Sequence, residues 1–286
     1  MNITKDVEEL IGKVDIGIFD SGIGGITVLR ELMKSVPTGV RFHYFGDTAR
    51  VPYGSKPPSE IKKYVHQVFD FFRSLSVEAI VTACNTSDSI LSKEEKKSLE
   101  VPFFSIIDPV TEALKNDLPI NSSVAIIGTR NTIKRSLYLK KLIGSDNICR
   151  ISQKACPLFV PLVEEGVWEG TLAETIVRYY LRGIKRFAPD YLILGCTHYP
   201  FLLKPIKTYL GEDVKVVDPA EYVAREFKAW IENQQNDVDS TVVFYVTGEV
   251  VSFTESLKMM GFDNAKIDSV KHVDISSLEE ALWQTR

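Results

Sequence analysis

The stretch Ala-Ile-Val-Thr-Ala-Cys-Asn-Thr at residues 79–86 has a counterpart in Tyr-Leu-Ile-Leu-Gly-Cys-Thr-His-Tyr at residues 191–199. In each stretch a short apolar run, typical of a buried parallel strand, leads to a cysteine that small polar residues follow. Open α/β sheets bind their ligands in the crevice at the carboxyl ends of parallel strands. We therefore expect Cys84 and Cys196 to point into such a crevice from two similar halves of the chain.

Two thiols that face one substrate from opposite sides suit a particular chemistry. One group removes a proton, and the other returns a proton to the opposite face. A thiolate and a thiol form a base and an acid of matched strength. Taken singly, each cysteine is more simply interpreted as a small buried hydrophobe, which is what most free cysteines are. The parallel placement of Cys84 and Cys196, with Asn-Thr and Thr-His directly after them, favours the chemical interpretation.

The composition is that of an ordinary globular chain and argues against several functions. The chain has 286 residues, of which 44% are hydrophobic and 25% charged. Its net charge of −4 does not indicate the basic surface that binds nucleic acid. The polar, acidic opening does not resemble a signal peptide, and no apolar run approaches the roughly 20 residues that span a bilayer. Four cysteines without a C-x-x-C pair predict a reducing cytoplasm, no disulfide framework and no structural metal.

Apolar runs alternate with amphipathic stretches along almost the whole chain, which predicts a parallel α/β fold. Strands are expected at residues 15–19, 40–45, 79–83, 103–106, 123–127, 147–152, 191–194, 214–217, 242–246 and 270–275. Helices are expected at residues 25–35, 59–74, 108–116, 132–143, 158–164, 171–187, 220–233 and 251–260.

The two halves of the chain repeat one layout. Each reads strand, glycine-containing loop and helix, and later strand, cysteine, helix, strand and Asp-Pro. Asp108 follows Cys84 by 24 positions, and Asp218 follows Cys196 by 22. Because proline suits the first turn of a helix, we interpret each Asp-Pro as a crossing between two lobes. The prediction is two pseudo-symmetric open parallel-sheet α/β lobes with the active site in the cleft between them. The first lobe comprises residues 1–107 and 219–286, and the second comprises residues 108–218.

The loop Asp20-Ser21-Gly22-Ile23-Gly24-Gly25 follows the first strand and leads into a helix. Backbone N–H groups in such a loop attract an anion. The dinucleotide pattern G-x-G-x-x-G fails because Thr27 takes the third glycine position, and no G-K-[ST] P-loop is present. The carboxylate of an amino acid therefore fits this loop better than a pyrophosphate. The alternative is a tight strand–helix turn with Asp20 as the helix cap.

A second loop, at residues 46–56, and a histidine supply further candidates. Tyr53 and Gly54 could contact a ligand through the hydroxyl and the backbone N–H, or form only a surface turn. His198 could hold or relay a proton, or simply be satisfied in the packing of its loop. Glu164 or Glu165 could be its partner, and spacing does not choose between them.

Other cysteine chemistries fit less well. Neither strand-end cysteine has an arginine six positions later, as a phosphatase C-x5-R loop requires. A cysteine hydrolase could use Cys196 with a histidine, but it would leave Cys84 unexplained.

Six motifs, in order over about residues 14–220, resemble those of the bacterial glutamate racemases, within the cofactor-independent aspartate/glutamate racemase superfamily. They are Phe19-Asp20-Ser21-Gly22-Ile23-Gly24-Gly25, Gly46-Asp47-Thr48-Ala49-Arg50-Val51-Pro52-Tyr53-Gly54, Ala83-Cys84-Asn85-Thr86, Gly128-Thr129-Arg130-Asn131-Thr132-Ile133, Cys156-Pro157-Leu158-Phe159-Val160-Pro161-Leu162 and Leu194-Gly195-Cys196-Thr197-His198-Tyr199-Pro200.

The resemblance implies interconversion of L- and D-glutamate without pyridoxal phosphate, metal or nucleotide. It further implies a supply of D-glutamate for peptidoglycan synthesis, a homodimer, and two α/β lobes with the site between them. Cys84 and Cys196 would be the two acid/base residues, with Asp20 assisting Cys84, and with His198 and Glu164 assisting Cys196. The substrate contacts that the resemblance implies are Asp20, Ser21, Pro52, Tyr53, Gly54, Asn85, Thr86, Thr129, Thr197 and His198.

Two features depart from the family pattern. Ser87 and Asp88 follow Asn85-Thr86 where the family usually has two small residues, the first of them apolar. A carboxylate that pointed at Cys84 would disfavour its thiolate, and we expect Asp88 to lie along the helix, facing away. The residues before Val14 form an extension, interpreted as a small amphipathic helix or a frayed end.

Two alternatives stay open at this point. One is an aspartate racemase or another amino-acid racemase of the superfamily, which Thr197-His198 after the second cysteine disfavours. The other is a non-catalytic amino-acid-binding protein. The presence of both cysteines argues against it, because a sensor needs neither thiol.

Overall fold

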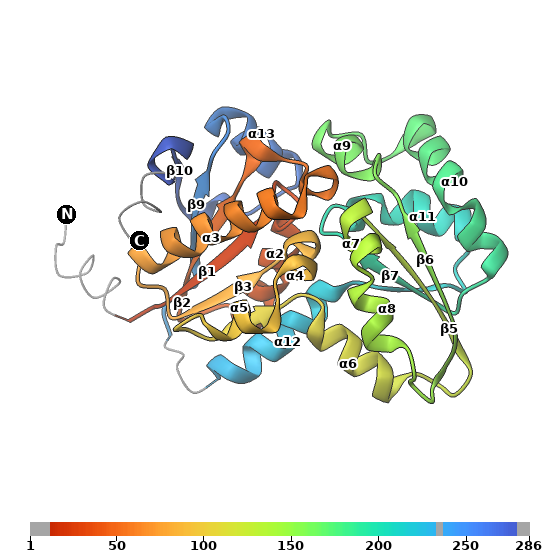
Figure 1. Ribbon diagram of the computed structural model, residues 1–286. Coiled ribbons are helices and arrows are strands. Elements are labelled where there is room, and N and C mark those ends of the chain that lie inside the picture. Colours follow the sequence, from red (N-terminus) through yellow and green to blue (C-terminus); the bar gives the residue numbers. More distant parts are fainter. Residues whose placement is uncertain (1–11, 233–236, 279–286) are drawn as a thin grey trace.

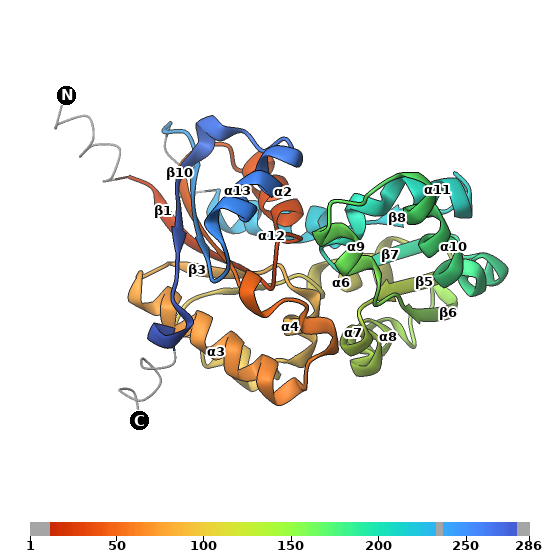
Figure 2. The ribbon, with the colours of Figure 1, turned by 90° about the horizontal axis from the view of Figure 1, so that it is seen from above.

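The computed structural model describes residues 12–232 and 237–278 as two lobes, each built on one parallel sheet with helices on both faces (Figure 1, Figure 2). The predicted α/β class is confirmed. The extension before Val14 lies, apart from residues 12 and 13, outside the described residues. In the part of the chain that is described, no helix has the length and apolar character needed to cross a membrane.

Six strands form the sheet of the first lobe and four form that of the second. The first sheet has the order β10-β9-β2-β1-β3-β4, with β1 (Val14–Asp20), β2 (Val40–Gly46), β3 (Ala79–Thr82), β4 (Phe103–Ser105), β9 (Thr241–Val246) and β10 (Ile267–His272). The second sheet has the order β6-β5-β7-β8, with β5 (Ser122–Gly128), β6 (Ile148–Ala155), β7 (Tyr191–Gly195) and β8 (Lys215–Val217). All of these pairings are parallel.

The predicted internal repeat is visible in the strand order. Within the first sheet β2-β1-β3-β4 has the same order as β6-β5-β7-β8, so β1 corresponds to β5, and β3 to β7. In each sheet the chain runs from the inner strand, β1 or β5, to the strand on one side of it, β2 or β6. It later returns to form the strand on the other side, β3 or β7. This reversal between β1 and β3, and between β5 and β7, is the topological switch point at which α/β sheets bind ligands.

Each predicted strand is present, and most boundaries agree within two residues. The last strand lies three residues earlier than predicted, at Ile267–His272. Burial on both faces explains why the strands could be recognised. All seven residues of β5 are buried, and β1 has only one partly exposed residue, so their apolar runs are nearly continuous.

The helices cover both faces of the two sheets and connect the strands. They are α2 (Ile26–Ser35), α3 (Pro58–Ser74), α4 (Asn85–Ile90), α5 (Lys93–Lys97), α6 (Asp108–Asp117), α7 (Arg130–Arg135), α8 (Leu137–Leu142), α9 (Phe159–Glu164), α10 (Gly170–Phe187), α11 (Leu203–Leu210), α12 (Pro219–Ile231) and α13 (Val250–Met259). Short 3₁₀ helices are η1 (Thr48–Arg50), η2 (Tyr53–Ser55), η3 (Tyr199–Leu202) and η4 (Asn264–Lys266).

The single helix predicted at residues 132–143 is wrong. Ser136 has φ 54° and ψ 31°, a left-handed conformation that separates α7 from α8. A right-handed helix cannot pass through a residue in this conformation. The expected ranges also did not include α4, α5 or α11, which are short, although a helix was expected after each cysteine.

The chain passes between the two sheets at the two Asp-Pro sites. The first crossing runs from β4 through α6, whose first residue is Asp108, to β5. The second runs from β8 through α12, which Asp218 caps, to β9. Helices α6 and α12 pack against each other. The lobe boundaries themselves, residues 1–107 with 219–286 and residues 108–218, stay a prediction.

Candidate active site

The two strand-end cysteines occupy matching places in the two sheets. Cys84 lies two residues beyond β3 and is the residue that precedes the first turn of α4. Cys196 directly follows β7. Both are buried, with 5% and 6% of their surface exposed. Each thiol therefore stands at the carboxyl edge of its sheet, beside the switch point.

Hydrogen bonds between the lobes show that the two carboxyl edges face each other. The Thr86 hydroxyl, after Cys84, lies 2.9 Å from the hydroxyl of Thr129, which follows β5. The Thr197 hydroxyl, after Cys196, donates to Asp20 Oδ1 at 3.1 Å. Asp20 is the last residue of β1. Thr86 and Thr197, which follow the two cysteines, therefore each contact the carboxyl end of the inner strand of the opposite sheet.

The glycine loop after β1 packs directly against the second lobe. A β-carbon on Gly24 would lie 2.4 Å from His198 Nδ1, and one on Gly22 would lie 2.5 Å from Glu164 Oε1. Glycine is therefore required at these positions by close approach. Asp20 Oδ2 accepts from the Gly22 N–H at 3.0 Å, and Gly25 is the residue that caps α2. The alternative in which Asp20 itself caps that helix is wrong.

A three-membered chain of polar groups lies on the Cys196 side. The Cys196 sulfur is 3.8 Å from His198 Nδ1, and His198 Nε2 is 2.5 Å from Glu164 Oε1. Glu164 Oε1 also accepts from the backbone N–H of Ile23 in the first lobe, at 3.4 Å. Glu165 is exposed. The structure therefore identifies Glu164 as the partner of His198, a choice that the sequence spacing left open.

Burial and hydrogen bonding act in opposite directions on His198. Burial lowers its pKa, but the hydrogen bonds to the Cys196 sulfur and to Glu164 outweigh burial and hold the pKa well above its ordinary value. These hydrogen bonds thus favour the protonated form of the imidazole beside Cys196.

The Cys84 side carries the opposite charge. Burial, together with the negative charge of Asp20, raises the pKa of the Cys84 thiol to about 12, against the hydrogen bonds that it makes with Ser87 and Ser21. The Cys84 sulfur donates to the Ser21 hydroxyl at 3.7 Å. Burial raises the pKa of Asp20 to about 6, although the nearby charge of His198 opposes this. Cys84 is therefore a thiol at neutral pH, with a carboxylate in its surroundings.

In the loop at residues 46–56, the Tyr53 hydroxyl and Gly54 both contact other residues of the protein. The Tyr53 hydroxyl donates to the buried carboxylate of Asp47, which also accepts from Arg50 Nε at 2.8 Å. That hydroxyl is thus turned inward, whereas Gly54 lies against Thr129, to which a β-carbon would come within 2.5 Å. Pro52, next to Tyr53, is exposed. The substrate contacts suggested for this loop stay predictions.

The sequence interpretation missed several residues that hold the predicted ones in place. The Tyr138 hydroxyl, from α8, donates to Asn85 Oδ1 at 2.6 Å. Asn131, from α7, donates to the carbonyl of Tyr53 at 3.1 Å. Asn131 belongs to a quoted motif and could have been singled out. Tyr138 carries no local signal, because its role depends on the fold.

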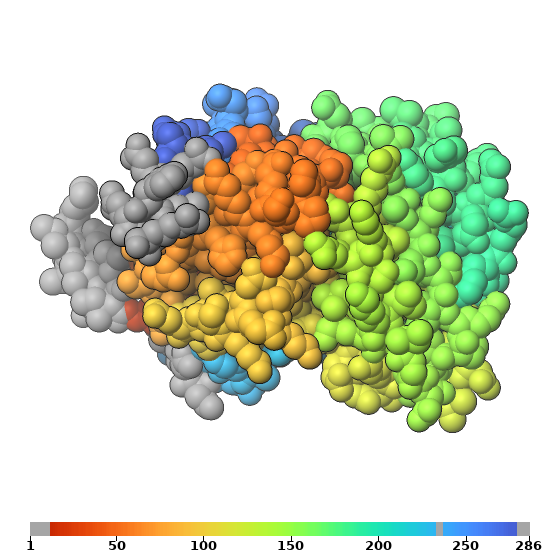
Figure 3. Space-filling view, viewed as in Figure 1, coloured from red at the N-terminus to blue at the C-terminus, as the bar shows by residue number. Residues whose placement is uncertain are grey.

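The two carboxyl edges lie against each other, and both thiols are buried. The small cavity beside Cys196, which Asn85 and Thr27 also line, is too narrow to admit a water molecule. In space-filling view, segments of the two lobes meet along a seam (Figure 3). A much larger cavity of about 960 Å³ lies on the outer side, among α5, α6 and α8, and neither cysteine lines it. Among the described residues, no group of three or more metal-binding side chains is present.

Fold and site together define a two-lobed α/β protein with a buried thiol at the switch point of each sheet. Comparison with family models makes the assignment specific. Residues 26–227 match the model of the Asp/Glu/Hydantoin racemase family, and the chain belongs to that family.

Known relatives agree with this assignment over nearly the whole chain. The glutamate racemase of Thermoanaerobacter sp. (strain X514) is 37% identical over 263 residues, which cover 91% of this chain and 97% of that protein. The structure of glutamate racemase from Thermus thermophilus in complex with beta-chloro-D-alanine has a TM-score of 0.80 at 36% identity, with 92% and 98% of the two chains covered. The structure from Francisella tularensis in complex with D-glutamate has a TM-score of 0.82 at 29% identity, with 93% and 99% covered.

Proposed function

We propose that this chain interconverts L- and D-glutamate by a cofactor-independent mechanism in which Cys84 and Cys196 are the two bases. The observation that carries the proposal is the matched position of the two buried thiols, at corresponding strand ends of two sheets whose carboxyl edges face each other. The glutamate racemases named above, similar over nine-tenths of the chain, support glutamate as the substrate.

The first demand of the reaction is to stabilise negative charge at Cα, because the α-proton of an amino acid is a very weak acid. Preorganised donors can do this where charge develops in the transition state. The hydroxyls of Ser21, Thr86 and Thr197 and the amide of Asn85 are buried polar groups around the two thiols, and they are suited to hold the substrate carboxylate.

The two sides of the site divide the proton transfers between them. His198 lies beside the Cys196 sulfur, while Cys84 holds its proton. For the enantiomer whose α-proton faces Cys196, that sulfur takes the proton and the Cys84 thiol delivers one to the other face. In the reverse direction the Cys84 proton must first leave the thiol, and ionised Asp20 is the base that accepts it on the first lobe.

Access to the thiols requires the two lobes to part. With Cys84, Cys196, Asp20 and His198 each less than a tenth exposed, a substrate cannot reach them without such a motion. Closure around glutamate would then exclude water, so that the carbanion is protonated by a thiol rather than by solvent.

The first test is incubation of the purified protein with L-glutamate in D₂O and no added cofactor. We expect circular dichroism to decay to zero while the α-proton signal disappears from the NMR spectrum. Aspartate, run in parallel, should be turned over far more slowly. Faster turnover of aspartate would assign the chain to another branch of the family, and binding of glutamate without either change would leave a non-catalytic binding protein.

The cellular role that we propose is the supply of D-glutamate for peptidoglycan synthesis, carried out by a cytoplasmic homodimer. Depletion of the protein should create a growth requirement for D-glutamate, and light scattering should give twice the mass of the 32.2 kDa chain. Growth without D-glutamate after depletion would contradict the proposed role, and a mass of one chain would contradict the dimer.

A further inference from the structure

Asp88 is a fully buried carboxylate whose partners all lie away from the two thiols. Its side chain is 0% exposed. Oδ2 accepts from the Ser105 hydroxyl at 2.6 Å and from the Ile107 N–H at 3.1 Å. Oδ1 forms an ion pair with Lys96 Nζ at 2.5 Å. A carboxylate that is hydrogen-bonded on one oxygen and ion-paired on the other is compensated for its burial and fixes the groups that it binds.

The two hydrogen-bond partners of Asp88 belong to the first crossing between the lobes. Ser105 is the last residue of β4, and Ile107 precedes the first turn of α6. The Ser105 hydroxyl also accepts from the backbone N–H of Asp108, at 3.0 Å. Asp88 and Ser105 together therefore satisfy the N–H groups at the start of the helix that carries the chain into the second lobe.

Asp88 is also one helical turn from Cys84. Its backbone N–H donates to the Cys84 carbonyl at 3.0 Å, closing the first turn of α4. The two residues that follow Cys84 are held by the second lobe, Asn85 by Tyr138 and Thr86 by Thr129. Helix α4 has only six residues, so any movement at Asp88 is transmitted to the thiol at its start.

The charge of Asp88 is not the main influence on the thiol. The pKa of Cys84 is raised chiefly by burial and by Asp20, and the hydrogen bonds with Ser87 and Ser21 lower it. The effect of Asp88 on Cys84 therefore runs through the position of α4.

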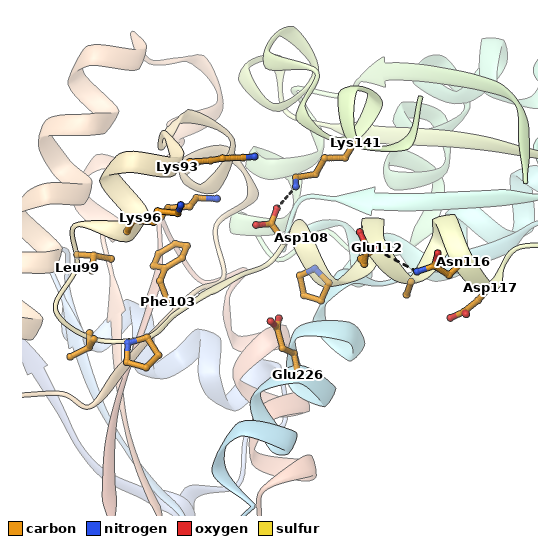
Figure 4. A pocket seen from close by; sticks show the side chains of 15 residues that line it. Lys93, Lys96, Leu99, Phe103, Asp108, Glu112, Asn116, Asp117, Lys141 and Glu226 are labelled. Atoms are coloured by element: carbon orange, nitrogen blue, oxygen red, sulfur yellow. Dashed lines mark hydrogen bonds and ion pairs between the residues drawn. The ribbon is translucent and has the colours of Figure 1, made fainter. Parts of the chain in front are cut away.

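We propose that Asp88, held by Lys96, is a positioning residue for proton transfer at Cys84, because it clamps α4 to the crossing at Ser105–Asp108. This inference rests on the racemase function proposed above. Figure 4 shows Lys96 beside Phe103 at the cavity on the outer side, where the Lys96 ammonium is 5.4 Å from the ring centre. Its side chain is 14% exposed, so the ammonium can reach water if the carboxylate is neutralised.

The test substitutes Asp88→Asn, which keeps the shape and an acceptor for Ser105 and Ile107 but removes the ion pair. Lys96→Gln, at a partly exposed position, tests the same clamp if the first variant does not fold. We expect kcat to fall about tenfold in Asp88→Asn, because a small misplacement of a reacting group is costly, and by less in Lys96→Gln. The control is Asp15→Asn, which removes a carboxylate paired with Arg41 and His43 at the far end of β1.

The decisive readout is the deuterium isotope effect measured with each enantiomer of α-deuterated glutamate. If the step at Cys84 is slowed, the isotope effect should rise for the enantiomer whose α-deuteron faces Cys84 and should not rise for the other. A loss of folded protein lowers kcat but changes neither isotope effect. Asp15→Asn should leave both effects as they are in the wild type.

Two results would overturn the inference. One is a kcat that is unchanged in both Asp88→Asn and Lys96→Gln. The other is a lower kcat without a selective rise in the isotope effect for the enantiomer whose α-deuteron faces Cys84. If the wild-type protein does not racemise glutamate at all, the proposed function fails, and that outcome is separate from both of these.

Discussion

Cys84 and Cys196 have corresponding positions in the two sheets but unlike electrostatic surroundings. Cys84 has the carboxylate of Asp20 nearby, whereas Cys196 has the imidazole of His198 within 3.8 Å. A repeated fold therefore does not give the two thiols equivalent surroundings. In the proposed two-base mechanism, this difference would distinguish the thiol that holds its proton from the sulfur beside His198.

Replacing either thiol tests its proposed role. We expect Cys84→Ser and Cys196→Ser each to lower the racemisation rate by about 10³-fold or more, because a hydroxyl is a far weaker acid than a thiol. Circular dichroism of glutamate follows the reaction. Cys149→Ser is the matched control, since Cys149 is an exposed cysteine on β6 and should be dispensable. Near-full activity in either of the first two variants would exclude the two-thiol mechanism.

The pH dependence follows from Asp20. Its pKa is raised to about 6, so the carboxyl is neutral below that pH and charged above it. If the charged form is the base that accepts the Cys84 proton, kcat/KM should fall as the pH drops through about 6 and should level off above it. In Asp20→Asn we expect a rate lower by about 10²-fold and no acid limb in this range. If kcat/KM of Asp20→Asn still fell as the pH drops through about 6, the titration of another group would be responsible.

At the scale of single elements, the glycine loop and the broken helix show how tertiary contacts select local structure. Ser136 adopts the left-handed conformation, which its hydroxyl supports by donating to the Ile133 carbonyl at 2.8 Å. Helix α7 presents Asn131 to the loop of Tyr53, and α8 presents Tyr138 to Asn85.

The close approach of the loop after β1 can be tested with an added methyl group. In Gly24→Ala the new β-carbon would meet His198 Nδ1 at 2.4 Å and Thr197 Oγ1 at 2.5 Å. We expect a loss of about 1–3 kcal/mol in the free energy of unfolding, from overpacking, together with lower activity from a displaced His198. Denaturant unfolding and the racemisation assay measure the two effects.

Gly183→Ala provides the matched control for this substitution. Gly183 lies inside α10, and a β-carbon there has nothing within 4 Å. Because alanine favours the helix over glycine, this variant should gain about 0.5–1 kcal/mol of stability and keep its activity. If Gly24→Ala behaved like Gly183→Ala, the contact between the loop and the second lobe would not be as tight as described.

At the scale of the whole molecule, the site belongs to neither lobe alone. Hydrogen bonds from Thr197 to Asp20 and from Ile23 to Glu164 join residues 177 and 141 positions apart. The two crossings at Asp108 and Asp218 are the covalent connections about which the lobes could part. The proposed opening for substrate and closure around it would thus involve both lobes.

Ligand binding should stabilise the closed arrangement of both lobes. In a Cys84→Ser, Cys196→Ser double variant, which avoids turnover, D-glutamate at 100 times its Kd should add about 2.7 kcal/mol to the free energy of unfolding. Thermal unfolding should then shift upward by several degrees. Glycine, which lacks the side-chain carboxylate, serves as the control ligand. Equal shifts with glycine and D-glutamate would contradict specific recognition of glutamate.

The sequence by itself determined the α/β class, the ten strands, the repeat and the placement of both cysteines at strand ends. These features rest on patterns of neighbouring residues, because continuous burial of a parallel strand and the turn chemistry after it are local. The choice of Glu164 over Glu165 was decided only by the tertiary structure. So were the reach of Asp20 to Thr197, the direction of Asp88 and the break at Ser136. Each of these depends on contacts between segments distant in the chain, whose separation and orientation no local pattern encodes.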